Sequence, residues 1–379
     1  MPPRPADRTA STGAWRAGDD PGRRRFARLT GAHPLALEAG GHLGPVDVAY
    51  ETWGELDEAA GNAVLVLHAL TGDSHASGAT ETGAGSPGWW PGIIGPGAPI
   101  DTDRFFVVCP NVLGGCQGTL GPGSVAPDGK RYGSRFPIIT IRDQVKVEAL
   151  LADHLGITRW AAVVGGSMGG MRVLEWCVGE PHRVERAVVI AVGAAATAEQ
   201  IGLCSLQVRC IRADPAFAGG DYYDNAEGPH RGMAIARGIG QLSYRTAAEL
   251  GVRFGREAQG AEQPLKGGRY SIESYLEHHG DSLLRRFDAN SYIVLSEAMN
   301  HHDVGRGRGG VGRALSRVEA QVSVVGISSD RLYPVGLQHE LAALLPRSPE
   351  VRVVESLVGH DGFLVETAAV GAAISEALA

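Results

Sequence analysis

The chain has 379 residues and a formal net charge of −7 at pH 7. This length is sufficient for one large domain or two modest ones with a well-buried core. Acidic residues outnumber basic ones, and no extended run of basic residues is present to bind phosphates, which argues against a nucleic-acid partner. The five cysteines form no C-x-x-C pair, and we find neither an apolar run of about 18 residues nor an apolar signal segment near the N-terminus. We therefore expect a cytoplasmic protein without a membrane partner.

The first part of the chain changes character near residue 30. Residues 1–30 mix Pro, Gly, Asp and Arg without hydrophobic periodicity, so we expect a loose N-terminal extension there. Apolar patterns then predict strands at 46–52, 63–67 and 105–109, a helix at 141–155, a strand at 160–164, a helix at 168–178 and a strand at 186–191. Such alternation predicts a mostly parallel sheet that is covered by helices on both faces.

The motif Gly165-Gly166-Ser167-Met168-Gly169 stands between the predicted strand at 160–164 and the helix that follows it. A serine in G-x-S-x-G at a strand-to-helix turn is typical of the nucleophile elbow of α/β hydrolases. The glycines leave room for a tight turn that exposes the serine hydroxyl. The motif is weak by itself, because a glycine-rich chain contains it by chance. Its significance depends on catalytic partners elsewhere in the chain.

The alternation stops from about residue 195 to about residue 316, where apolar residues recur at helical spacing. We interpret residues 195–316 as an inserted helical lid, with residues 31–194 and 317–379 forming the core. The G-x-G-x-x-G pattern at 305–310 follows no strand, so it does not predict a dinucleotide site. The histidine pairs at 278–279 and 301–302 have no third ligand at metal spacing, and we expect no metal.

Two more strands are predicted at 321–327 and 351–356, and each precedes a residue that a catalytic triad requires. Asp330 follows the first strand and His360 follows the second. The chain order Ser, Asp, His is the order of α/β hydrolases. We therefore expect Ser167 as nucleophile, His360 as general base and Asp330 as the acid that orients the imidazole.

An acyl-transfer site also needs two backbone N–H groups that stabilise the oxyanion of the transition state. In this fold one comes from the residue after the nucleophile, which is Met168. The other comes from the loop after an early strand. We expect it from Leu70, in the segment that follows the strand at 63–67.

Several segments together resemble one family. They are 68–72 (HALTG), 111–119 (NVLGGCQGT), 165–171 (GGSMGGM), 173–176 (VLEW), 330–334 (DRLYP) and 359–364 (GHDGFL). From about residue 35 to its end, the chain resembles the homoserine O-acetyltransferases of methionine biosynthesis. The resemblance implies an α/β-hydrolase fold with a helical lid, and acetyl transfer from acetyl-CoA to L-homoserine through an acetylated Ser167. It also implies a homodimer formed through the lid, with acetyl-CoA as a cosubstrate and no permanently bound cofactor.

The same resemblance suggests how a zwitterionic acceptor is held. Arg237 is expected to bind the homoserine carboxylate from the lid, because a planar guanidinium can donate to both oxygens. Asp361, beside His360, is expected to bind the ammonium group, and Thr71 is expected to contribute to substrate binding. Arg172 departs from the family pattern, since many relatives have glutamine there. It lies outside the nucleophile motif, so the expected reaction is unchanged.

Other functions remain open at this point. Homoserine O-succinyltransferase and serine O-acetyltransferase use the same scaffold and differ in pocket size around the acyl group and the acceptor. A plain esterase needs only water as acceptor, and no clamp for a zwitterion. The charged pair of Arg237 and Asp361 is what distinguishes an amino-acid acceptor from water. A scaffold that has lost catalysis is disfavoured by the intact Ser, Asp and His.

Overall fold

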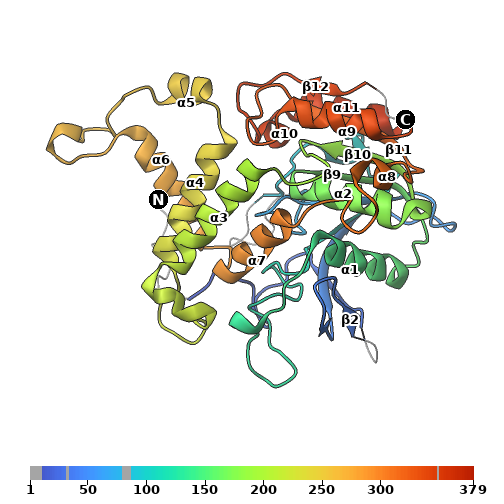
Figure 1. The fold of residues 1–379 in the computed structure, drawn as a ribbon, viewed down its shortest axis with the longest axis horizontal. Coiled ribbons are helices and arrows are strands. Elements are labelled where there is room, and N and C mark those ends of the chain that lie inside the picture. The colour runs from blue at the N-terminus through green and yellow to red at the C-terminus, as the bar shows by residue number, and fades with distance from the viewer. Residues whose placement is uncertain (1–10, 31–33, 79–86, 348–349) are drawn as a thin grey trace.

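The computed structural model describes residues 11–30, 34–78, 87–347 and 350–379 (Figure 1). Within these ranges the main sheet has eight strands in the order β1-β4-β8-β5-β9-β10-β11-β12. They are β1 (Arg25–Arg28), β4 (Asp47–Trp53), β8 (Phe106–Pro110), β5 (Ala63–Leu67), β9 (Trp160–Gly166), β10 (Val184–Ile190), β11 (Gln321–Ile327) and β12 (Arg352–Val354). The pairs β1/β4 and β4/β8 are antiparallel, and every pairing from β8 to β12 is parallel. The predicted mostly parallel sheet is confirmed.

Helices cover both faces of this sheet. Val64 and Val66 of β5 pack on the face that carries α11 (Thr367–Leu378), whereas Leu65 and Leu67 pack on the opposite face. That opposite face carries α1 (Ile141–His154), α2 (Met168–Gly179) and α9 (Val335–Leu344). Because both faces are buried, the central strands are continuously apolar, which is why they were recognisable in the sequence.

The shorter elements complete the core. They are β2 (Leu35–Ala36) paired with β3 (His42–Leu43), β6 (Ile94–Gly95) paired with β7 (Ile100–Asp101), the 3-10 turns η1 (Gly133–Arg135) and η2 (Pro181–Arg183), and the helix α10 (Gly362–Val365). In the part of the chain that the structure describes, no helix has both the length and the apolar character needed to cross a membrane.

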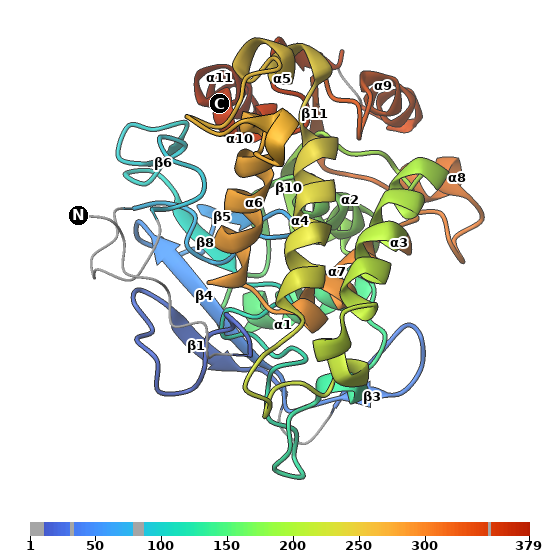
Figure 2. The same cartoon turned by 90° about the vertical axis from the view of Figure 1, so that its left-hand side faces the viewer.

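The predicted lid contains a set of helices that stand beside the sheet. They are α3 (Ala198–Arg212), α4 (His230–Tyr244), α5 (Ala247–Arg253), α6 (Ser271–Leu284), α7 (Ala289–Asn300) and α8 (Val311–Leu315), with 3-10 turns η3 (Pro215–Gly220) and η4 (Pro264–Lys266). α4 packs between α3 and α6, and Figure 2 shows these three helices side by side. A backbone bridge between Ala195 and Asp303 brings the start and the end of the insertion together. The inserted helical segment of the predicted fold is therefore present, and we propose 195–316 as its bounds.

The N-terminal segment differs from the expected loose extension. Residues 1–10 lie outside the described part of the chain, but β1 is the edge strand of the main sheet and pairs with β4. Thr12 is buried, and its hydroxyl donates a hydrogen bond of 2.8 Å to Asp288 of the lid segment. The expectation is thus wrong for residues 11–30. Only Ala27 of β1 is buried, so a single edge strand left no hydrophobic pattern in the sequence.

Candidate active site

Ser167 occupies a sharp turn between β9 and α2, with φ 56° and ψ −125°. A positive φ is strained for a residue with a side chain, and such strain is common at functional sites. The surrounding glycines are required by packing, because a Cβ atom at Gly169 would lie 2.0 Å from the carbonyl oxygen of Leu67. β5 and β9 are also in register here, with Leu67 opposite Gly165. The loop that follows β5 therefore starts directly beside the elbow.

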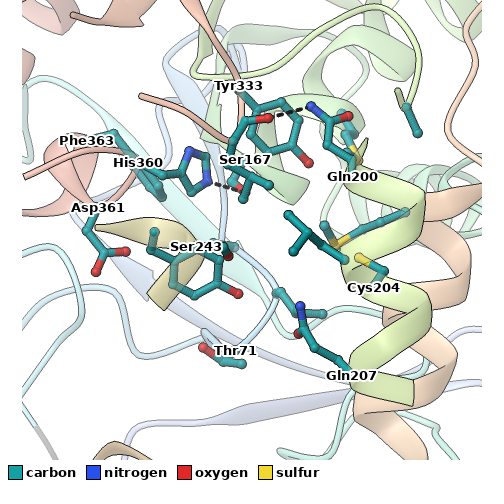
Figure 3. Close-up of a pocket in the computed structure, with 18 of the residues that line it drawn as sticks. Thr71, Ser167, Gln200, Cys204, Gln207, Ser243, Tyr333, His360, Asp361 and Phe363 are labelled. Carbon is teal, nitrogen blue, oxygen red and sulfur yellow. Dashed lines mark hydrogen bonds between the residues drawn. The ribbon is translucent and has the colours of Figure 1, made fainter. Parts of the chain in front are cut away.

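Ser167, His360 and Asp330 form one hydrogen-bonded chain, of which Figure 3 shows the bond between Ser167 and His360. Ser167 Oγ lies 2.9 Å from His360 Nε2, and His360 Nδ1 lies 2.6 Å from Asp330 Oδ2. All three residues are buried, and they follow β9, β12 and β11 at the carboxyl ends of parallel strands. The other oxygen of Asp330 accepts hydrogen bonds of 2.8 Å from the amides of Leu332 and Tyr333, which fixes the carboxylate. This is the arrangement that nucleophilic acyl transfer requires.

The environment of His360 tunes its proton affinity. Burial disfavours the charged imidazolium, but the hydrogen-bonded carboxylate of Asp330 outweighs burial and raises the pKa of His360 above its ordinary value. Aromatic rings surround the imidazole, with centroids 5.0 Å away for Tyr333, 5.5 Å for Phe363 and 5.9 Å for Tyr244. These rings hold the orientation of the imidazole and keep bulk water away from it.

A cavity lies above Ser167 between the sheet and the lid. On the core side it is lined by Ala69, Leu70, Thr71, Ser167, Met171, Leu332, Tyr333, His360, Asp361, Phe363 and Leu364. On the lid side it is lined by Ala196, Gln200, Leu203, Cys204, Gln207, Arg237, Ser243, Tyr244, Met299 and Asn300. The cavity therefore joins the hydrogen-bonded serine to polar groups from α3 and α4, as Figure 3 shows for the labelled residues.

Comparison with known proteins gives this site a family. A family model described as alpha/beta hydrolase fold matches residues 62–367. A homoserine O-acetyltransferase of Thermobifida fusca is 58% identical over 379 residues, which covers 100% of this chain and 98% of that protein. The chain belongs to the homoserine O-acetyltransferase family. Both the predicted family and the predicted α/β-hydrolase fold are confirmed.

Solved structures agree with this placement. The crystal structure of a homoserine O-acetyltransferase from Bacillus anthracis has a TM-score of 0.85 at 28% identity, covering 94% of this chain and 96% of that one. Esterase E22 has the same TM-score of 0.85 at 27% identity, covering 94% of this chain and 99% of that one. The fold of a homoserine O-acetyltransferase is therefore shared with a protein named as an esterase, and it does not by itself determine the acceptor.

In this member of the homoserine O-acetyltransferase family, the expected oxyanion donors lie on two elements that meet at the elbow. Met168 is the first residue of α2, so its N–H has no carbonyl one turn earlier in the helix to bind. Leu70 is buried and lines the cavity together with Ser167. Among the described residues, the Leu70 N–H has no hydrogen-bond acceptor. The assignment of both amides to the oxyanion stays a prediction.

Arg237 and Asp361 line the same cavity but differ in how they are paired. The guanidinium of Arg237 lies 5.6 Å from the ring centroid of Tyr244, and it makes no hydrogen bond or ion pair with any described residue. Asp361 Oδ2 lies 3.1 Å from Arg245 Nε and accepts a hydrogen bond of 3.3 Å from Gln241. Its Oδ1 has no partner among the described residues. Among the described residues Arg237 therefore has a ring contact but no hydrogen bond or ion pair, whereas one oxygen of Asp361 is already paired.

Thr71 and the face of α3 complete the lining. The carbonyl of Thr71 accepts a hydrogen bond from Arg286, which anchors the loop after β5 to the lid segment. Sequence reasoning did not identify the α3 residues, although they recur at the i, i+3, i+4 and i+7 spacing of one helix face. They are Gln200, Leu203, Cys204 and Gln207. Gln200 also donates a 2.7 Å hydrogen bond to the Leu332 carbonyl, which links the lid to the loop that carries Asp330.

The geometry of the described residues gives no evidence of a metal site. No group of three His, Cys, Asp or Glu side chains in these ranges is arranged to hold an ion. One of the histidines singled out in the sequence, His302, is buried and contacts the Gly193 carbonyl at 3.0 Å. Burial lowers the pKa of His302 to about 4, as expected for a neutral histidine in the core.

Proposed function

We propose that this protein transfers the acetyl group of acetyl-CoA to the hydroxyl of L-homoserine, giving O-acetyl-L-homoserine and CoA in methionine biosynthesis. The observation that carries the proposal is the 58% identity over the whole chain to a homoserine O-acetyltransferase. The hydrogen-bonded Ser167, His360 and Asp330 supply the required chemistry. No permanently bound cofactor is needed, because the serine itself carries the acyl group.

In the first half-reaction Ser167 attacks the thioester carbonyl. His360 Nε2 accepts the hydroxyl proton as the bond from Oγ to the acetyl carbon forms, and Asp330 stabilises the resulting imidazolium. The amides of Leu70 and Met168 stabilise the oxyanion. Cleavage of the carbon–sulfur bond then releases CoA, which takes its proton from His360, and leaves Ser167 acetylated.

The second half-reaction runs through the same groups. His360 removes the proton from the homoserine hydroxyl, the hydroxyl oxygen attacks the acetyl carbon, and the Ser167 oxygen leaves and regains its proton. Arg237 supports homoserine as acceptor, because a partly buried cation that has no hydrogen bond or ion pair with any described residue favours a ligand carboxylate. Asp361 lines the same cavity, and its Oδ1, which has no partner among the described residues, would accept from the ammonium group, while Thr71 contributes to the wall of the site.

The charges of the cavity favour acetyl over succinyl as the transferred group. A succinyl group would bring a second carboxylate beside that of homoserine. Among the described lining residues, Arg237 is the one arginine or lysine. Burying a carboxylate without a cation or hydrogen bonds is strongly unfavourable, so the second carboxylate would have no adequate partner.

We further propose that the protein is a cytoplasmic homodimer whose interface is formed by the lid. Apolar side chains that are exposed in the single chain support this interface. They are Ile201 and Leu206 of α3 and Ile235 and Leu242 of α4. Exposed apolar residues that gather on neighbouring helices are typical of protein–protein interfaces. Sedimentation at micromolar concentration tests this, and a monomer would contradict it.

A comparison of acyl donors and acceptors tests the proposed function. CoA release is followed by thiol titration with acetyl-CoA or succinyl-CoA, in the presence of L-homoserine, L-serine or no acceptor. We expect rapid release only with acetyl-CoA and homoserine. Equal release without an acceptor would instead support an esterase, and faster release with succinyl-CoA or serine would contradict the assigned substrates.

A further inference from the structure

Arg172 is a fully buried arginine on α2, the helix that begins directly after Ser167. Its guanidinium makes two directed contacts with other elements. Nη1 donates to Glu148 of α1 at 2.7 Å, and Nη2 donates to the carbonyl oxygen of His68. The second oxygen of Glu148 accepts a 2.8 Å hydrogen bond from the indole N–H of Trp176. One buried side chain thus connects α2, α1 and the first residue after β5.

A contribution to folding stability is a weak explanation for the buried ion pair of Arg172 and Glu148. Moving two charges out of water is costly, and replacing a buried ion pair by apolar residues of similar volume is often neutral or stabilising. Burial disfavours the charged carboxylate and raises the pKa of Glu148 despite the attraction of Arg172. The identity of the third partner, the His68 carbonyl, suggests a different role.

His68 begins the loop that supplies the Leu70 amide, and its ring is fixed as firmly as its carbonyl. Nε2 accepts a 3.1 Å hydrogen bond from the Val112 N–H, so the proton is on Nδ1, which donates to the Ala69 carbonyl at 2.7 Å. Burial and the nearby Arg172 lower the pKa of His68 to about 3, so the ring stays neutral. The hydrogen bonds of the His68 ring and those of its backbone carbonyl together hold the start of the loop in place.

The two expected oxyanion donors belong to separate elements: Met168 to α2 and Leu70 to the loop after β5. Their spacing depends on how that loop sits against α2. Arg172 is on α2 and holds the carbonyl two residues before Leu70. Donors that are preorganised at the correct spacing are what make an oxyanion hole effective.

We propose that Arg172 is a positioning residue of the oxyanion hole, whose bond to the His68 carbonyl fixes the loop of Leu70 against the helix of Met168. The proposal rests on the acyl-serine reaction given above. The oxyanion forms in both half-reactions, so a misplaced donor slows both by a similar factor. A residue that only binds homoserine would slow the second half-reaction alone.

The test removes the bond to the loop without leaving an unpaired charge in the core. In the double variant Arg172→Met/Glu148→Gln both charges are absent, and the glutamine oxygen can still accept from the Trp176 indole. We expect acylation and deacylation to fall in parallel by about ten- to a hundredfold, the scale of a donor displaced by about 1 Å. The KM for homoserine is expected to stay within about twofold, because no acceptor contact is removed.

A matched control sits on the same helix. Arg308 pairs with Glu175 of α2, and neither residue has a hydrogen bond or ion pair with residues 68–78 of the loop after β5. Glu175 also lies 3.6 Å from Nε of Arg142, which keeps its pairing with Glu38. Arg308→Met/Glu175→Gln therefore removes a partly buried ion pair from α2 but leaves the His68 carbonyl bound. We expect its half-reaction rates to stay within about twofold of wild type. An equal loss in both double variants would overturn the proposal, because general loosening of α2 would then explain the result.

Acylation is measured with acetyl-CoA and, separately, as the burst of p-nitrophenol from p-nitrophenyl acetate. The ester reports on the oxyanion hole whatever the natural donor is, so a failure of the proposed function is distinguished from a failure of Arg172. Unchanged burst and deacylation rates in a folded double variant would overturn the proposal. If that variant does not fold, Arg172→Lys is used, since an ammonium lacks the planar fork that reaches both partners. A parallel fall of both rates supports the proposal, and wild-type rates contradict it.

Discussion

The carboxyl edge of the sheet and the helical lid face each other across one cavity, but their polar groups are paired differently. At the sheet edge, Ser167, His360 and Asp330 are hydrogen-bonded to one another, and Asp330 is held by two further amides. On the lid, the Arg237 guanidinium has neither a hydrogen bond nor an ion pair with any described residue. The polar groups of the sheet edge are paired with one another without a ligand, whereas we expect Arg237 on the lid to be paired by the substrate.

This difference suggests a division of labour between the two regions. Esterase E22 shares the fold with a TM-score of 0.85 at 27% identity. The overall fold therefore does not decide between water and an amino acid as acceptor. We infer that Ser167, His360 and Asp330 perform acyl transfer to and from serine, and that Arg237 on the lid selects the acceptor together with Asp361 beside His360. Changes at Ser167, His360 or Asp330 should then affect both half-reactions, and a change at Arg237 only the second.

The largest effect is expected for Ser167→Ala. It removes the atom that carries the acyl group, so homoserine-dependent CoA release should fall by at least about a thousandfold. The alanine has no larger side chain than the serine, and the melting temperature should change little. CoA release and thermal unfolding are measured on the same sample. A folded variant with a tenth of wild-type turnover would disprove the covalent route.

The second largest effect is a loss of acylation in acid. The base must be neutral, and the pKa of His360 lies above its ordinary value because Asp330 outweighs burial. The acylation rate should therefore fall by about tenfold per pH unit below that raised pKa and level off above it. Arg237 is not among the groups that shift the pKa of His360, so Arg237→Leu should keep the same acid limb. If Arg237→Leu shifted the pH at which acylation falls, the proposed separation of roles between the sheet edge and the lid would be contradicted.

A smaller effect, confined to the acceptor, is expected for Arg237→Leu. Loss of a charge-assisted contact should lower kcat/KM for homoserine by about ten- to a hundredfold. With 3-aminopropan-1-ol, which is homoserine without its carboxylate, wild type and variant should react equally. Arg231→Leu, an exposed arginine of α4 outside the cavity, is the matched control. An equal penalty for both acceptors would mean that Arg237 does not bind the carboxylate.

The smallest effect is expected for Asp361→Asn, because Arg245 and Gln241 already occupy one oxygen of this carboxylate. We expect kcat/KM for homoserine to fall by about tenfold or less. The acid limb of acylation should also move to lower pH, since Asp361 contributes to the raised pKa of His360. At a pH above the acid limb, the reaction of 4-hydroxybutanoate, which lacks the ammonium group, should be insensitive to the substitution. A hundredfold loss with both acceptors would place Asp361 in the catalytic machinery instead.

The sheet edge was predictable from the sequence because its determinants are local. Ser167 directly follows β9, Asp330 and His360 lie in the loops after β11 and β12, and the glycines of the elbow are required by backbone contacts such as that of Gly169 with Leu67. The fold class and the family followed from these segments and are confirmed. The catalytic roles of the three residues stay predictions, although the structure brings their side chains together.

The lid and the N-terminal segment were less predictable because long-range packing decides them. Gln200 and Gln207 lie on one face of α3, and in the sequence this face looks like one that is exposed to solvent. Only the packing of α3 beside α4 directs it toward Ser167. Thr12 is buried through a partner 276 positions away, Asp288. Arg172 gave no signal of its role, since its contacts with Glu148 and His68 depend on how three elements meet.

The division between sheet edge and lid is tested most directly by acetylating the enzyme with acetyl-CoA alone and then adding homoserine. Mass spectrometry follows the acetyl group on the Ser167 peptide in wild type and in Arg237→Leu. We predict that both become acetylated at the same rate, and that homoserine removes the acetyl group about ten- to a hundredfold more slowly from the variant. Slower acetylation of the variant, or wild-type enzyme that never carries an acetyl group on Ser167, would contradict the account.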